Sequence, residues 1–171
     1  MVEVTRTFVE MRDPGQLKRK ELPPGSAARF VRCRPCSVAH YRELYGRVGA
    51  QWHWTDRNAF SDEKLAAILA NPDVHVWELR VDDELAGYFE LEKQLGPVVE
   101  IVYFGLTPEF IGRGYGGAML TRAVEEAWAL GTEKVWLHTC TLDSPRALPN
   151  YEARGFVKTG KVEKYVVQLS D

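Results

Sequence analysis

Residues 104–118 read FGLTPEFIGRGYGGA, and this stretch carries the strongest structural signal in the chain. Thr107-Pro108 ends an apolar strand, because proline has no backbone N–H to donate to a sheet. The glycines that follow let the backbone turn sharply and let its N–H groups approach a ligand closely. A helix with one apolar face then runs to Leu130. Since a helix N-terminus attracts anions, this strand, turn and helix predict a phosphate-binding site.

Predicted strands flank this unit on both sides. Val74–Val81, Leu85–Leu91 and Val98–Leu106 follow one another through short connections, which is typical of an antiparallel meander. Lys134–Thr141 comes after the helix and is expected to lie parallel to Val98–Leu106, as in a βαβ crossover. The sequence therefore predicts a mixed sheet of α/β or α+β character, with helices on both faces.

The other predicted elements precede and follow this centre. Ser37 and Ser61 are each expected to cap a helix, because serine side chains accept hydrogen bonds from the first backbone amides of a helix. Ser144-Pro145 is expected to start a last helix, and Pro149 inside it predicts a kink. The remaining expected segments are an opening strand (Val2–Met11), a linker (Asp13–Ser26) and short strands at Arg29–Arg34, Phe156–Lys158 and Lys161–Leu169.

The glycine turn fits more than one interpretation. Gly112, Gly114 and Gly117 match the G-x-G-x-x-G fingerprint of dinucleotide-binding folds, and Glu133 lies where such folds place a ribose-binding acid. Against this, Thr107–Ile111 separates the glycines from their strand, and too few residues follow for a doubly wound sheet. A structural alternative is that the glycines only allow a tight strand–helix turn.

Two segments point to a known family. Arg113 to Ala118 also reads Arg-x-x-Gly-x-Ala, and in this pattern the chain resembles the GNAT superfamily of acetyl-CoA-dependent N-acetyltransferases. Ala147–Phe156, ALPNYEARGF, is similar to the family's later motif, with its Ala-x-x-x-Tyr and terminal Gly-Phe. The resemblance extends over Val74–Phe156. It implies a GNAT-like fold, acetyl-CoA as co-substrate and no metal.

The resemblance also assigns a cofactor site. In the family, a bulge splays the strand ending at Leu106 from its parallel neighbour, and a backbone N–H there polarises the acetyl carbonyl. The pantetheine arm would lie in this splay, alongside Thr139–Leu142. Ser144 stands where the family often has an Asn whose side chain contacts pantetheine. The residues expected to contact the cofactor are Phe104, Gly105, Leu106, Arg113, Gly114, Tyr115, Gly116, Gly117, Ala118, Ser144 and Ala147.

Two residues are candidates for catalysis. In the family, the tyrosine at the position of Tyr151 protonates the departing thiolate, and a phenol of pKa ~10 suits a thiol of pKa ~8.5. Glu100 lies thirteen residues before Arg113, the spacing of the general base in histone-type members. A carboxylate in an apolar strand must face a cleft or find a partner. A core role for Tyr151 and an exposed ion pair for Glu100 are the structural alternatives.

An aromatic segment is the candidate acceptor site. Trp52, Trp54 and Asp56 lie between the first two helices, where this family recognises its acceptor. Aromatic faces and a carboxylate suit a cationic amine. Residues 51–100 carry 11 acidic and 4 basic side chains, which also favours a cationic ligand. Packing tryptophans and a solvated acidic face are the alternatives.

The cysteines and histidines allow two further hypotheses. Cys33 and Cys36 form a single C-x-x-C, which would serve as a redox pair or, with His138 and Cys140, as a zinc site. No second C-x-x-C supports the zinc hypothesis. The expected metal content is therefore none, and the histidines at positions 40, 75 and 138 are expected to pack or face solvent.

Composition excludes several classes of protein. The chain has 171 residues, 45% of them hydrophobic, and a formal net charge of −2. This excludes a disordered chain and disfavours a nucleic-acid partner. No apolar run approaches a membrane span, and the odd cysteine count without a signal-like N-terminus predicts a cytoplasmic protein.

These observations lead to one expected function. The chain is expected to be a single acetyltransferase domain over residues 1–171, in which an amine directly attacks acetyl-CoA in a ternary complex. Its acceptor would be a small-molecule or peptide amine, and it would act without nucleic acid or membrane, alone or as a homodimer. A non-catalytic acyl-CoA-binding module and a relative that uses another acyl group are the alternatives. The expected parts are a strand and linker (1–26), acceptor-side helices (27–73), the cofactor-binding core (74–158) and a closing strand (159–171).

Overall fold

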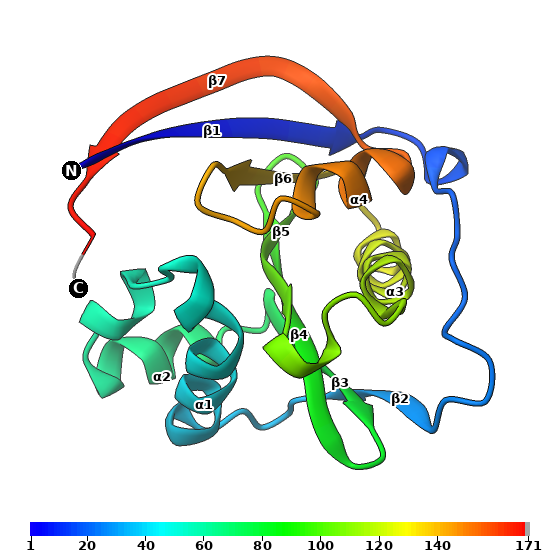
Figure 1. The fold of residues 1–171 in the computed structure, drawn as a ribbon, viewed down its shortest axis with the longest axis horizontal. Helices are drawn as coiled ribbons and strands as arrows, with labels where there is room; N and C mark the ends of the chain where they lie inside the picture. Colours follow the sequence, from blue (N-terminus) through cyan, green and yellow to red (C-terminus); the bar gives the residue numbers. More distant parts are fainter. Residues whose placement is uncertain (170–171) are drawn as a thin grey trace.

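The predicted mixed sheet is present in the computed structural model, which describes residues 1–169. Within these residues seven strands lie in the order β2-β3-β4-β5-β6-β1-β7 (Figure 1). The strands are β1 (Val2–Met11), β2 (Ala28–Arg32), β3 (Val74–Val81), β4 (Glu84–Gln94), β5 (Val98–Leu106), β6 (Lys134–Cys140) and β7 (Val157–Val167). The α-helices are α1 (Val38–Gly49), α2 (Asp62–Ala70), α3 (Tyr115–Ala129) and α4 (Ala147–Ala153). Short 3-10 turns lie at η1 (Pro14–Gln16), η2 (Ala50–Trp52), η3 (Asp56–Ala59) and η4 (Pro108–Phe110).

Strand directions agree with the sequence pattern. β3, β4 and β5 form an antiparallel meander, and β5 and β6 are parallel on either side of α3. Asp82 and Asp83 both adopt positive φ, 50° and 63°, in the two-residue turn between β3 and β4. Such a turn matches the twist of an antiparallel hairpin, so the meander prediction is confirmed.

The predicted helix ends are largely confirmed. The Ser37 and Ser61 hydroxyls each accept a backbone hydrogen bond at 3.1 Å, from His40 and Lys64, and so begin α1 and α2. Gly114 precedes α3 with φ +90°, a backbone conformation that other residues rarely adopt.

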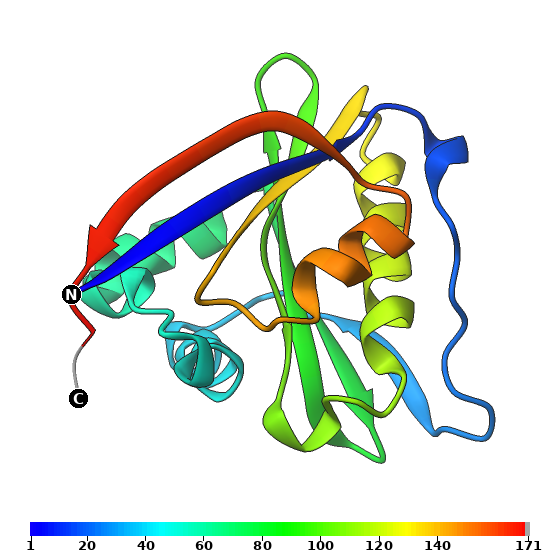
Figure 2. The same cartoon turned by 45° about the horizontal axis from the view of Figure 1, so that its top comes forward.

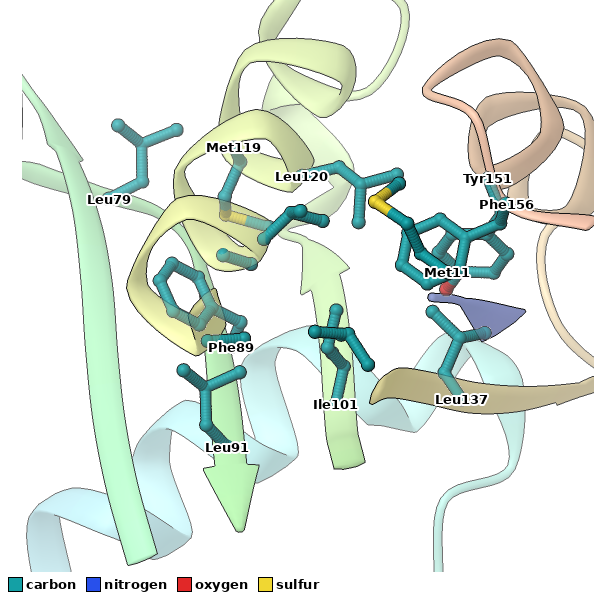
Figure 3. Close-up of a cluster of buried hydrophobic side chains, with 14 of the residues drawn as sticks. Met11, Leu79, Phe89, Leu91, Ile101, Met119, Leu120, Leu137, Tyr151 and Phe156 are labelled. Atoms are coloured by element: carbon teal, nitrogen blue, oxygen red, sulfur yellow. The ribbon is translucent and has the colours of Figure 1, made fainter. Parts of the chain in front are cut away.

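Helices cover both faces of the sheet (Figure 1). On one face, Met119 and Leu120 of α3 pack with Phe89, Ile101 and other strand residues (Figure 3). The opposite face carries α1 and α2, which bury a second, aromatic-rich cluster. Within residues 1–169, no helix is long and apolar enough to cross a membrane.

The linker between β1 and β2 is a packed strap along α3 (Figure 2). The Lys18 amide donates to the Arg154 carbonyl at 2.9 Å, and the Lys20 amide donates to Thr121 Oγ1 at 3.0 Å. The strap carries the chain from β1, near one edge of the sheet, to β2 at the opposite edge. It therefore places Lys20 beside the start of α3.

Two predictions about the last helix are wrong. The last helix begins at Ala147, and Ser144 lies before it as the acceptor of a 3.2 Å hydrogen bond from the Arg146 amide. Pro149 is therefore in the first turn of α4, where backbone N–H groups have no intrahelical partner, so it gives no reason for a kink.

The two predicted closing strands form the single strand β7. Its pairing with β1 shifts register between Thr7 and Val9, opposite the stretch that contains Gly160. Gly160 has φ +88°. Gly160, which lies between the two predicted strands, is thus part of an irregularity within one strand.

A buried ion pair fixes the loop after α1 to the sheet. Arg57 Nη2 lies 2.8 Å from Glu90 Oε2, and both side chains are almost inaccessible to solvent. The Tyr41 hydroxyl donates to Glu90 Oε1 at 2.6 Å, and the Tyr45 hydroxyl accepts from the Arg57 amide at 3.3 Å. Buried polar contacts of Arg57 thus attach η3 to β4 and α1.

Replacing Arg57 with Leu is expected to destabilise the protein by about 3–5 kcal/mol, because it leaves the Glu90 carboxylate buried without its partner. Urea unfolding measures the change. Arg29→Leu is the matched control, because Arg29 pairs with Asp83 in full solvent and should cost about 1 kcal/mol or less. Equal losses in the two variants would contradict the assignment.

Candidate active site

A cavity of about 1160 Å³ opens where β5 and β6 diverge. The two strands pair only from Val98 to Glu100, opposite Lys134 to Trp136. Beyond this point β5 stays with β4 and β6 stays with β1, so two strand edges face each other across the cavity.

A bulge accompanies this divergence. Ile101 pairs with Leu91 and Tyr103 pairs with Glu90, so Val102 is an extra residue in β5. Bulges bend a strand and leave the ladder locally disrupted. The splay and the bulge both occur where the resemblance places them.

The glycine turn forms one end of the cavity. Gly112, Gly114, Gly116 and Gly117 all line it. A methyl group at Gly112 would come 2.9 Å from Nη1 of Arg146, and one at Gly117 would come 3.2 Å from Nη1 of Arg154.

Cationic side chains therefore gather around the start of α3. Besides these two arginines, the Lys20 side chain also lies against Gly117 and lines the cavity. The free amides of a helix N-terminus and nearby cations together favour an anion.

Most of the predicted cofactor residues meet at this cavity. Eight line it: Phe104, Gly105, Leu106, Gly114, Gly116, Gly117, Ser144 and Ala147. The structure does not bring three others to its wall. Arg113 stacks over the Phe110 ring at 4.6 Å and donates to the Glu109 carbonyl, while Tyr115 and Ala118 are buried residues of α3 itself.

Trp52, Trp54 and Asp56 also line the cavity, through the loop after α1. Trp54 also packs at 5.8 Å from the Tyr45 ring and 5.0 Å from the Tyr103 ring, so it has a structural role as well. Asp56 is exposed at the first position of η3. Aromatic faces and a carboxylate are thus close together at one end of the site.

Glu100 does not reach the cavity wall itself. Its side chain is 13% exposed, and Gln94 Nε2 donates to its Oε2 at 2.8 Å. Burial raises the pKa of Glu100 to about 7. His138 Nε2 lies 3.8 Å from Glu100 Oε1, and His138 does line the cavity.

The expectation that His138 only packs or faces solvent is therefore incomplete. It lies between the buried carboxylate and the open site. Burial lowers the pKa of His138, so its imidazole is mainly neutral near pH 7.

Tyr151 projects from α4 toward the space between Ile101 of β5 and Leu137 of β6 (Figure 3). Its ring packs edge-on against Phe104 at 6.0 Å and Phe156 at 6.3 Å, and the residue lines the cavity. Burial, and then the charge of Asp143, raise the pKa of Tyr151 well above its usual value. The phenol is thus protonated at neutral pH and able to donate.

The zinc set considered from the sequence does not assemble. Cys33 and Cys36 follow β2 on one side of the sheet order, whereas His138 and Cys140 lie on β6. Among the described residues, the group of three or more metal-binding side chains that does come together is Cys33, His40 and Glu78.

Sequence reasoning missed Lys20 and undervalued Arg146 and His138. Lys20 carried no signal, because its position depends on how the strap packs on α3. Arg146 lies one residue before α4, and from sequence alone a charge at such a position more often indicates a solvated surface than a phosphate contact. His138 could have been found from strand alternation, since it shares a face with Trp136, the partner of Glu100.

The sequence model of the acetyltransferase (GNAT) family matches residues 40–156. This chain belongs to the GNAT family. The matched segment contains the glycine turn, the splayed strands and α4. No curated protein sequence matches the chain.

Solved structures share the GNAT fold at low sequence identity. A GCN5-related N-acetyltransferase from Kribbella flavida is 19% identical, with a TM-score of 0.67 over 94% of this chain and 56% of its own length. An aminoglycoside acetyltransferase from an uncultured soil metagenomic sample is 16% identical, with a TM-score of 0.62 over 84% of this chain and 95% of its own.

A spermidine N-acetyltransferase from Vibrio cholerae, in complex with CoA and spermine, is 20% identical with a TM-score of 0.62. That match covers 78% of this chain and 82% of the other. This chain spans less than two thirds of the Kribbella flavida structure. All three structures are at most 20% identical to this chain, so these similarities establish the fold alone.

Proposed function

We propose that this protein is an acetyl-CoA-dependent N-acetyltransferase in which a primary amine attacks the thioester directly in a ternary complex. The observation that carries the proposal is the lining of the cavity. Residues of the glycine turn, Tyr151 and the Trp52–Asp56 loop all line one and the same cavity. A thioester and an amine can therefore meet in it.

The cofactor end fits acetyl-CoA in charge and shape. Its phosphates would lie against the first amides of α3, with Lys20, Arg146 and Arg154 around them. Its pantetheine arm would pair with the strand edges that β5 and β6 leave facing each other. When bound, acetyl-CoA supplies the acetyl group as a thioester.

The acceptor end suits a cationic amine. Asp56 supplies a negative charge, and Trp52 and Trp54 supply aromatic faces that attract ammonium groups. Two proteins of the same fold, named above, act on aminoglycosides or spermidine, and both classes are polyamines. This likeness supports an amine acceptor and leaves its identity to experiment.

Proton transfers would use three side chains. Glu100 would accept the ammonium proton, with neutral His138 relaying it between the cavity and the carboxylate. A backbone N–H near Leu106 would polarise the acetyl carbonyl. Tyr151 would donate its hydroxyl proton to the departing sulfur.

Thiol release tests the proposal. The purified chain is mixed with acetyl-CoA and, in turn, polyamines, aminoglycosides, amino acids and peptides, while calorimetry measures cofactor binding. Thiol release that depends on an amine is the expected result. Binding of acetyl-CoA without thiol release for any amine would favour a non-catalytic module. Thiol release only from another acyl-CoA would show that the protein uses a different acyl donor.

Gly116→Asp is expected to fold but to bind acetyl-CoA on the order of 10–100-fold more weakly, because the carboxylate would oppose the phosphates. Folding should survive, since a Cβ there meets only ordinary contacts, at 3.6 Å to Asn150 and 3.8 Å to Leu106. Calorimetry measures the loss, with Gly46→Asp in open space on α1 as control. Unchanged affinity would overturn this placement of the phosphates.

A further inference from the structure

A second cluster of reactive side chains lies away from the cavity, where the end of β2 meets the start of α1. Cys33 and Cys36 bracket the turn between these elements, and their Sγ atoms are 2.7 Å apart. His40 lies in the first turn of α1, and its Nε2 is 2.9 Å from Oε2 of Glu78 on β3. None of these four residues lines the cavity of the proposed active site.

Three of the four donor atoms converge on one point, and the fourth adjoins one of them. Single donor atoms of Cys33, His40 and Glu78 all lie within 4.8 Å of one another, and Cys36 adjoins Cys33. A tetrahedral zinc ion with Zn–S of ~2.3 Å and Zn–N or Zn–O of ~2.0–2.1 Å holds its ligands ~3.3–3.8 Å apart. To reach this geometry the two close pairs would need to separate by about 1 Å or less, and the Cys36 side chain would need to turn toward His40 and Glu78.

The surroundings also hold the donors in place. Glu78 is 7% exposed, and its other oxygen, Oε1, accepts from Arg80 Nη2 at 2.6 Å. The Cys33 amide donates to the Val76 carbonyl at 2.9 Å, which fixes the first cysteine to β3. Outer hydrogen bonds of this kind orient metal ligands.

Charge favours a divalent cation. Two thiolates and the Glu78 carboxylate would supply three negative charges, and a neutral His40 would supply none. With Zn²⁺ one negative charge remains, and Arg80 balances it. Binding would release the two thiol protons to solvent, as metal binding to cysteines generally does.

From this arrangement we infer that Cys33, Cys36, His40 and Glu78 form a tetrahedral zinc site. All four positions are taken by protein, which is typical of a structural site. The ion would tie the start of α1 to β2 and β3. Since α1 carries Tyr45 and leads into the Trp52–Asp56 loop, the site would brace the acceptor side of the cavity.

Metal titration of the full chain tests the inference. The reduced protein is stripped with a chelator and titrated with Co²⁺, which reports thiolate ligands by a charge-transfer band and tetrahedral geometry by its ligand-field bands. One equivalent of Co²⁺ should bind, and Zn²⁺ should displace it. Cys36→Ser should remove the charge-transfer intensity of one thiolate and weaken Zn²⁺ binding by at least the ~10–100-fold seen for outer-shell partners.

Matched variants make the outcome decisive. Cys140→Ser and His75→Gln change the same residue types outside the cluster and should leave the titration unchanged. Cys36→Ser is preferred to Glu78→Gln, because Glu78 also forms an ion pair with Arg80. Circular dichroism verifies that the Cys36→Ser variant is folded. Absence of the band in reduced wild-type protein would overturn the site. So would equal titrations for Cys36→Ser and wild type, or a Cys33–Cys36 disulfide that reforms in air without any Co²⁺ binding after reduction.

Discussion

Glu100→Gln should lower turnover by ~10²–10⁴-fold at pH 7, because an ammonium group cannot attack until a base removes its proton. Burial raises the pKa of Glu100 to about 7, so the wild-type kcat/KM should rise with pH through that value. The variant should lose this acidic limb. It should regain activity at high pH, where the acceptor amine deprotonates by itself. A pH series of initial rates measures all three effects.

Glu92→Gln is the matched control for Glu100. Glu92 is the cross-strand partner of Glu100, and its charge helps to raise the pKa of that carboxyl. Its removal should shift the acidic limb to lower pH without lowering the plateau. Wild-type rates for Glu100→Gln at pH 7 would assign the base to another group.

Stability offers a second readout for Glu100. A carboxyl whose pKa is raised by folding binds its proton more tightly in the native state. The protein should therefore lose stability as pH rises from Glu100's ordinary pKa toward about 7. Glu100→Gln should lack this contribution, so urea midpoints of the two proteins should diverge across that window.

Tyr151→Phe should lower turnover by ~10²-fold or more while acetyl-CoA affinity stays unchanged. The ring packs against Phe104 and Phe156, and phenylalanine keeps these contacts. Only the proton donor is removed, so the loss should appear in kcat. Steady-state kinetics and calorimetry on one preparation separate the two quantities.

The loss at Tyr151 should also depend on the leaving group. More acidic thiols leave as thiolates without a proton donor. With acyl thioesters of such thiols, the difference in kcat between Tyr151→Phe and wild type should therefore be smaller. Tyr115→Phe is the matched control, because Tyr115 is equally buried but does not line the cavity. Full turnover in Tyr151→Phe would reduce this residue to a packing role.

Local patterns predicted the sheet core well. Helix caps, the meander and the crossover follow from hydrogen bonding and alternation within short windows. The end of the chain was harder, because two short strands were expected on either side of Gly160, whereas pairing with β1 holds β7 together across it. Likewise, Pro149 predicts a kink only if α4 begins at Ser144, and it begins at Ala147.

In the candidate site, too, residues within contiguous motifs were predicted and residues brought together from distant segments were not. Glycine spacing and the Tyr151 motif predicted residues that line one cavity, since both motifs lie in contiguous sequence. Lys20, His138 and the cluster around Glu78 depend on contacts between distant segments, which spacing cannot reveal. The C-x-x-C was noticed, but its neighbours proved to be His40 and Glu78 rather than His138 and Cys140.

The place of β1 has a consequence for synthesis. Met11 pairs with Val135 and Val2 pairs with Val167, so β1 leaves the ribosome more than a hundred residues before its partners. The meander and α3 can form without β1. The part of the cavity wall that β6 provides is completed only when β6 has been synthesised and has paired with β1. Such distant pairings slow folding and leave an unpaired strand edge exposed in the meantime. We expect nascent chains stalled before β7 to be unable to hold this half of the sheet, and to depend on chaperones more than stalled chains of a helical protein of equal length.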